Sequence, residues 1–71
     1  MILEIGDTII FYDVIRRKHV IGIVEEGTLD DICNIHSSYG HTLSNISTIT
    51  ENWGDFGTIE DLEISHPEWF V

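Results

Sequence analysis

The stretch that decides the fold reads Ile5-Gly6-Asp7-Thr8-Ile9-Ile10-Phe11-Tyr12-Asp13, and a charged connection joins it to His19-Val20-Ile21-Gly22-Ile23-Val24-Glu25. Both runs are rich in β-branched and aromatic residues, which favour strands. Gly6-Asp7 predicts a turn into the first strand, and the charged residues between the runs predict a hairpin connection. Gly22 lies in the middle of the second run, so it predicts a bulge or a close approach of two backbones.

Short apolar runs separated by turn residues continue to about residue 50. The expected elements are, in order, a turn at Glu26-Gly27-Thr28, a strand at 31–36, a turn at 37–40, a strand at 41–44, and a short turn with a fifth strand at 45–50. Ile46 and Ile49 are expected to face inward in the fifth strand. This spacing predicts a mainly β fold, a small antiparallel barrel of about five strands.

The last part of the chain has a different pattern. Trp53–Gly57 predicts a loop with two aromatic anchors. We therefore expect residues 1–50 to form the β core and residues 51–71 to form an acidic, aromatic tail packed on it, within a single domain. The first two strands are apolar on both faces, and such strands are covered on both faces. Either the tail or a second subunit in a homodimer could supply the cover.

Residues 58–64 are predicted to form one short element before His66-Pro67. Thr58 with Asp61 three residues later resembles a capping box, which predicts a helix that turns Ile59 and Leu62 inward. The alternation in Leu62-Glu63-Ile64 favours a strand equally, so helix and strand both remain open.

The charge of the chain is strongly one-sided. Thirteen carboxylates face three basic residues, and the net charge is -10 over 71 residues. The three basic residues are adjacent, at Arg16, Arg17 and Lys18. Repulsion among so many uncompensated charges destabilises a compact state. A partner that normally binds a polyanion is the simplest reason for the imbalance, with solubility or a halophilic source as the alternatives.

Several other classes fit the sequence poorly. Acidic residues surround Cys33, which disfavours a reactive thiolate, and no phosphate loop or dinucleotide fingerprint is present. We expect no enzyme activity, no catalytic residue and no cofactor. Arg16–Lys18 form only a short basic patch, so direct binding of nucleic acid is not expected. The lone cysteine, the absence of a signal peptide and the lack of a long apolar run predict a cytoplasmic protein with no membrane contact.

The spacing of Cys33, His36 and His41 resembles that of a zinc site, for which His19 or His66 could supply a fourth ligand. Structural zinc needs four nitrogen or sulfur ligands, and no second cysteine is available. A buried, packing role for the cysteine is favoured, and no metal is expected.

The quoted opening, together with Gly22-Ile23-Val24-Glu25 and Tyr39-Gly40-His41-Thr42-Leu43, resembles SH3-like barrels of the KOW and Tudor type. The resemblance covers residues 3–50 and implies an SH3-like barrel. It also implies the second functional candidate, a module that recognises a peptide through aromatic residues.

By size and charge the chain also resembles the small acidic DNA mimics that bacteriophages direct against host proteins. Their targets include the nucleoid protein HU, uracil-DNA glycosylase and restriction enzymes. This resemblance implies a phage protein that blocks a basic DNA-binding protein of a bacterial host, such as HU, in the host cytoplasm. The acids expected to form the binding face are Glu25, Glu26, Asp30, Asp31, Glu51, Asp55, Glu60, Asp61, Glu63 and Glu68.

Overall fold

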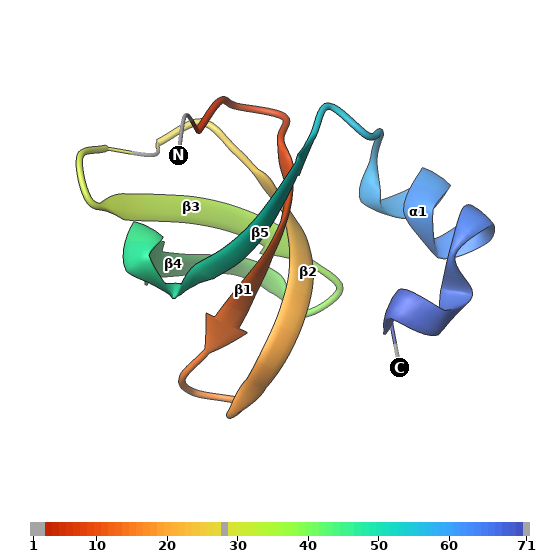
Figure 1. The fold of residues 1–71 in the computed structure, drawn as a ribbon, viewed down its shortest axis with the longest axis horizontal. Coiled ribbons are helices and arrows are strands. Elements are labelled where there is room, and N and C mark those ends of the chain that lie inside the picture. The colour runs from red at the N-terminus through yellow and green to blue at the C-terminus, as the bar shows by residue number, and fades with distance from the viewer. Residues whose placement is uncertain (1–2, 28, 71) are drawn as a thin grey trace.

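The computed structural model describes residues 3–27 and 29–70 and is built around one antiparallel sheet (Figure 1). Its five strands lie in the order β4-β3-β2-β1-β5. The elements are β1 (Thr8–Asp13), β2 (Lys18–Val24), β3 (Ile32–Ser37), β4 (Gly40–Asn45), the 3-10 turn η1 (Ile46–Thr48), β5 (Ile49–Gly54), α1 (Ile59–Ser65) and the 3-10 turn η2 (Pro67–Phe70). The predicted mainly β class, with about five antiparallel strands and a short C-terminal element, is confirmed. Residues 1–2, 28 and 71 lie outside the described residues. Thr28 is the last residue of the turn that the sequence predicts after the second strand.

The turn between β1 and β2 is organised by a buried aspartate. Asp13 Oδ1 accepts hydrogen bonds from the backbone N–H groups of Ile15 and Arg16, and the Asp13 carbonyl accepts one from Arg17. Aspartate favours such turns because its side chain bonds to the backbone two or three residues on. Arg17 completes the turn in the left-handed region, with φ of 58°. The predicted hairpin is therefore present without an Asn-Gly turn.

Gly22 marks a close approach of β2 to β3, which was one of its two predicted roles. It pairs with Ile9 on β1 and with Ser37 on β3, with no register shift between β1 and β2. A Cβ atom built on Gly22 would contact the Ile35 side chain and would lie 2.9 Å from the His36 carbonyl oxygen. The backbones can pack this closely because residue 22 has no side chain.

One face of the sheet encloses the main core. The buried cluster consists of apolar side chains from four strands, namely Ile9, Phe11, Val20, Val24, Cys33, Ile35 and Ile49. Alternation along β3 places Cys33 and Ile35 inside and leaves Ile32, Asn34 and His36 on the other face. The buried residues are thus apolar residues of the strands that the sequence predicts, and their burial stabilises the sheet.

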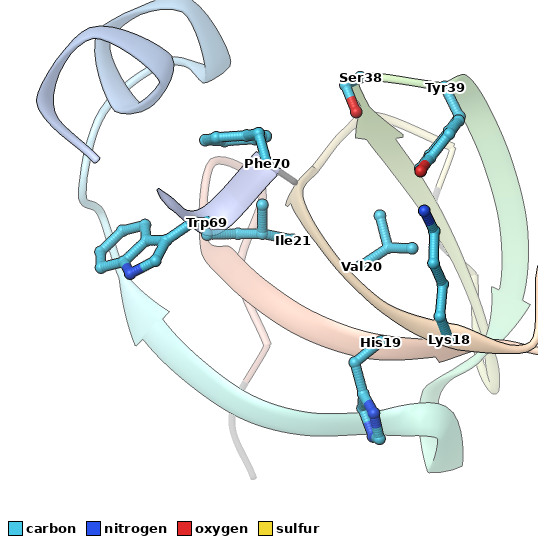
Figure 2. Close-up of a pocket in the computed structure, with 8 residues that line it drawn as sticks. All are labelled: Lys18, His19, Val20, Ile21, Ser38, Tyr39, Trp69 and Phe70. Atoms are coloured by element: carbon cyan, nitrogen blue, oxygen red, sulfur yellow. The ribbon is translucent and has the colours of Figure 1, made fainter. Parts of the chain in front are cut away.

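The tail covers part of the outer face. Ile21 points away from the main core, yet it is only 4% exposed. Trp69 and Phe70 of η2 lie against Ile21, in a narrow seam of about 20 Å³ that leaves room for little more than one water (Figure 2). Tail and strand β2 thus contact each other directly, while Ile23 on the same face is half-buried.

The region after β4 differs in detail from the sequence expectation. The fifth strand begins at Ile49, after η1, and runs through Trp53 to Gly54, so the loop begins later than predicted. Ile46 was expected to face inward, and this was wrong. It lies in η1 with 37% of its surface exposed, because the 3-10 turn breaks the strand alternation that the prediction assumed. Ile49 is buried, as expected.

The alternatives for residues 58–64 resolve to a helix. Thr58 is the N-cap of α1, and the reciprocal hydrogen bonds with Asp61 that define a capping box are both present. Ile59 and Leu62 are buried one turn apart, as the helical alternative requires. In Figure 1, α1 lies beside the sheet, beyond the end of β5.

Candidate functional site

The outer face of β3 and β4 carries two adjacent imidazoles. His36 and His41 are directly paired across the hairpin, whose turn is the predicted Ser37–Gly40. Their ring centroids lie 4.8 Å apart, with 30° between the ring planes. Because side chains that face each other across paired strands lie on the same side of a sheet, the register brings these two rings together.

A carboxylate from the end of β2 completes this cluster. Ile23 pairs with His36, and Glu25, two residues further, is on the same face. The Glu25 Oε1 atom lies 3.0 Å from His36 Nδ1. One ligand atom each of Glu25, His36 and His41 can be chosen so that all three lie within 4.8 Å of one another. We call these three residues the Glu–His–His cluster.

A pocket of about 370 Å³ borders the cluster. It lies between the sheet and the N-terminal end of α1, and Glu25 and His36 form part of its wall. The other lining residues are Gly6, Ile23, Asp55, Gly57, Thr58, Ile59 and Glu60. Its volume falls at the small end of the range for ligand sites. With three carboxylates on its wall, the pocket favours cations over anions.

The ten acids expected to form a binding face are distributed over five parts of the chain. Nine of them are exposed and Glu25 is half-buried. They follow β2 (Glu25, Glu26), precede β3 (Asp30, Asp31), lie in or just after β5 (Glu51, Asp55), belong to α1 (Glu60, Asp61, Glu63) and lie in η2 (Glu68).

The structure brings three of these acids together and gives others local roles. Glu25, Asp55 and Glu60 line the same pocket. Asp61 is engaged in the capping box. Glu68 lies 3.4 Å from the His66 imidazole, measured from Oε1 to Nδ1. The carboxylates are therefore not interchangeable members of one face.

The basic residues lie together at the β1–β2 turn. Arg16 Nη1 donates to Asp13 Oδ2 at 2.7 Å. The Arg16 guanidinium and the Lys18 ammonium also lie 4.2 and 4.7 Å from the centroid of the Tyr39 ring, a cation–π arrangement. Figure 2 shows the Lys18 side chain pointing toward Tyr39. The two cations thus have partners within their own end of the molecule.

Asp13 is a buried carboxylate that the sequence analysis did not identify. Burial of its side chain raises the pKa of Asp13, but hydrogen bonds from Arg16 and Ile15 and the charge of Arg16 outweigh this effect. The pKa of Asp13 therefore lies below its usual range. The signal in the sequence was an aspartate placed just before a short turn with an arginine three residues later.

Cys33 does not join the two histidines that the zinc hypothesis grouped with it. Its side chain is buried in the main core, whereas His36, three positions along β3, is on the outer face. An odd spacing along a strand separates two side chains to opposite faces. That ligand set is therefore ruled out, and Glu25 takes the place beside the histidines.

A cluster of aromatic side chains organises the tail. Trp53 and Trp69 lie 4.4 Å apart between ring centroids, Phe56 contacts both, and His66 stacks on Trp69 at 3.8 Å. Phe56 is exposed, while Trp53 and Trp69 are half-buried. The cluster holds the loop after β5 against η2 and leaves one aromatic surface open to solvent.

Comparison with protein-family models, curated proteins and solved structures finds no match for this chain. Among the helices of the described residues, none has the length and apolar character needed to cross a membrane.

Proposed function

We propose that this protein is an acidic DNA mimic, which occupies the DNA-binding surface of a basic protein such as the nucleoid protein HU. The observation that carries the proposal is the separation of charge. All three basic residues lie at one hairpin turn, and nine of the ten candidate acids are exposed elsewhere. The partner would be a protein of a bacterial host, met in its cytoplasm if a phage encodes the chain.

Distance keeps the two signs apart. Strand β2 runs from Lys18 to Val24, and seven extended residues place its ends about 20 Å from each other. This separation exceeds the roughly 8 Å over which charges interact at physiological salt. The basic turn therefore does not neutralise the acids that follow β2, and their negative charge remains available to a cationic partner.

The size of the molecule is compatible with this role. Its longest axis is 32 Å. Duplex DNA carries one charge per about 1.7 Å, so an equal length of duplex carries about nineteen charges. A net charge of -10 is of the same order. A homodimer, which remains a prediction, would lengthen the charged surface.

A competition experiment tests the proposal. Fluorescently labelled duplex DNA is bound to purified HU, the protein is added, and release is followed by anisotropy at low and high salt. We expect release of DNA at micromolar concentration, weakening as salt rises, and no binding of DNA by the protein alone. Polyglutamate at equal total charge is the control, because it measures what unspecific polyanion binding achieves.

Failure to release DNA from HU and from several other basic DNA-binding proteins would contradict the proposal. Release no better than that by polyglutamate would also count against a shaped, DNA-like surface.

The second candidate is a KOW/Tudor-like module that recognises a peptide. The observation that favours it is the Trp53–Phe56–Trp69 cluster with its exposed Phe56. Clustered aromatic rings can bind cationic peptide groups. Binding by such a surface would depend weakly on salt and would be lost in Phe56→Ala, whereas a DNA mimic would retain its partner in this variant.

A further inference from the structure

We propose that the Glu–His–His cluster binds one Zn²⁺ or a similar transition-metal ion, with Glu25, His36 and His41 as its protein ligands. Neutral imidazole is the commonest metal ligand in proteins, and a carboxylate with two histidines is an established zinc ligand set. The inference stands independently of the proposed DNA mimicry, because it uses neither the charge separation nor the partner.

The geometry requires small movements only. Zinc bonds to nitrogen and oxygen of about 2.0–2.2 Å place the ligand atoms of a tetrahedral site about 3.4 Å apart. The Glu25 Oε1 to His36 Nδ1 distance is already 3.0 Å. The widest separation within the chosen ligand atoms is 4.8 Å. Rotation of His41, whose side chain is exposed at the edge strand β4, can close the difference.

Two of the three ligands lie on paired strands, and a backbone hydrogen bond positions the third. His36 and His41 are held opposite each other by the β3–β4 register, and Glu25 is held by a hydrogen bond from its own backbone N–H to the Asn34 carbonyl, 2.8 Å long. Because His36 and His41 are on paired strands, their backbone loses little conformational entropy on binding, which favours affinity. The cluster is therefore largely preorganised.

The surroundings favour a cation and select its type. Asp55 and Glu60 line the same pocket as Glu25 and His36, and the whole chain carries a net charge of -10. This negative potential raises the local concentration of cations. Two imidazoles favour Zn²⁺, Ni²⁺ or Cu²⁺ over Mg²⁺ and Ca²⁺, which require oxygen ligands.

Three protein ligands leave a coordination position for water or for a group supplied from outside. Structural zinc sites are closed by four protein ligands, whereas sites with three remain open to exchange. Glu25 and His36 form part of the pocket wall. The metal site, with its exchangeable coordination position, therefore borders this pocket. Water or a neutral side chain of a partner could complete the metal's shell there.

Titration of the full chain, first freed of metal with a chelator, tests this site. Zn²⁺ is added as its chloride, and binding is measured by calorimetry and by competition with a chromophoric chelator. We expect one Zn²⁺ per chain, unaffected by excess Mg²⁺ or Ca²⁺. Co²⁺ should give a visible d–d spectrum without a thiolate charge-transfer band, because Cys33 lies on the opposite face.

Variants of the cluster and a matched control locate the ion. We expect Zn²⁺ binding to weaken in each of three variants, His36→Ala, His41→Ala and Glu25→Gln. The loss should be at least about 10–100-fold, because removal of even an outer-shell partner of a metal ligand costs this much. The control is His19→Ala, which removes an exposed histidine near the other end of β2 and should leave affinity unchanged. His41 is exposed on an edge strand, so its variant should keep the fold, verified by circular dichroism.

The proposal would be overturned by any of three results. These are the absence of saturable binding at one ion per chain, an unchanged affinity in folded His41→Ala, and an equal loss in His19→Ala.

Discussion

Arg16 Nη1 lies 2.7 Å from Asp13 Oδ2, and this ion pair joins an exposed turn to a buried carboxylate. The Asp13 side chain is 2% exposed and that of Arg16 is 32% exposed. A carboxylate can be buried here because the guanidinium and two backbone N–H groups replace its hydration. The pair therefore contributes to the stability of the β1–β2 hairpin in a pH-dependent way.

Asp13→Asn should lower the free energy of unfolding at pH 7 by about 1–2 kcal/mol, since it removes the charge but keeps the size of the side chain. The pKa of Asp13 is lower in the folded than in the unfolded chain. Its contribution is thus complete above the unfolded pKa of about 3.9 and is lost as the pH falls through the folded value. Urea unfolding at pH 7, 5 and 3 should show the variant and the parent converging at low pH.

Glu63→Gln is the control for Asp13→Asn, since it neutralises an exposed acid and should change stability by less than about 0.5 kcal/mol. If the loss in Asp13→Asn is the same at pH 3 as at pH 7, its origin is steric and the ionic explanation is wrong.

Gly22→Ala should destabilise the fold by about 1–3 kcal/mol, because the added methyl group overlaps the Ile35 side chain and the His36 carbonyl. The measurement is the denaturant midpoint. Ser38→Ala, a change of similar size at an exposed position, should have little effect. A Gly22→Ala variant as stable as the parent would mean that β2 and β3 can separate at low cost.

Thr8→Val should leave stability unchanged or raise it by up to about 1 kcal/mol. Thr8 is fully buried, and within residues 3–27 and 29–70 its hydroxyl has no hydrogen-bond partner. Replacing an unsatisfied hydroxyl with a methyl group of the same shape removes a desolvation cost. Thermal unfolding of Thr50→Val, whose hydroxyl donates to the Ile10 carbonyl, provides the comparison. A clear loss in Thr8→Val would indicate that an ordered water satisfies this hydroxyl.

Charge reversal at exposed acids should weaken binding to a basic partner without unfolding the chain. The two pairs are Asp30→Lys with Asp31→Lys, and Glu60→Lys with Glu63→Lys; the second pair leaves the Thr58–Asp61 capping box intact. Steering by charge predicts that most of the loss falls on the association rate and shrinks at high salt. Surface plasmon resonance across a salt series measures both effects.

The neutral versions of these pairs, with Asn or Gln, are the matched controls and should give a smaller loss than the lysine versions. Binding that is flat in salt and unchanged in both reversed pairs would show that the acidity serves solubility and that the interface is apolar.

The sequence predicted the local features well and the non-local ones poorly. The hairpins, the turn at Ser37–Gly40 and the capping of α1 by Thr58 depend on residues close together in the chain, and all are present. The late start of the fifth strand at Ile49 was missed, because η1 interrupts the alternation before it.

The candidate metal site shows the same limit. His36 and His41 could have been placed opposite each other from the predicted turn alone. The position of Glu25 beside them depends on the register between β2 and β3, which the sequence pattern leaves open. The grouping of Cys33 with the histidines failed because it used spacing along the chain and ignored which face of a strand each residue occupies.

The confinement of the basic residues to the β1–β2 turn has one more consequence. A molecule with its positive charges at one end and a large excess of negative charge elsewhere has a permanent dipole moment, here with its positive end at the Arg16–Lys18 turn. In the field of a positively charged surface the molecule rotates before it makes contact, with this turn pointing away. Docking is then biased to one orientation, and a larger fraction of the encounters leads to binding.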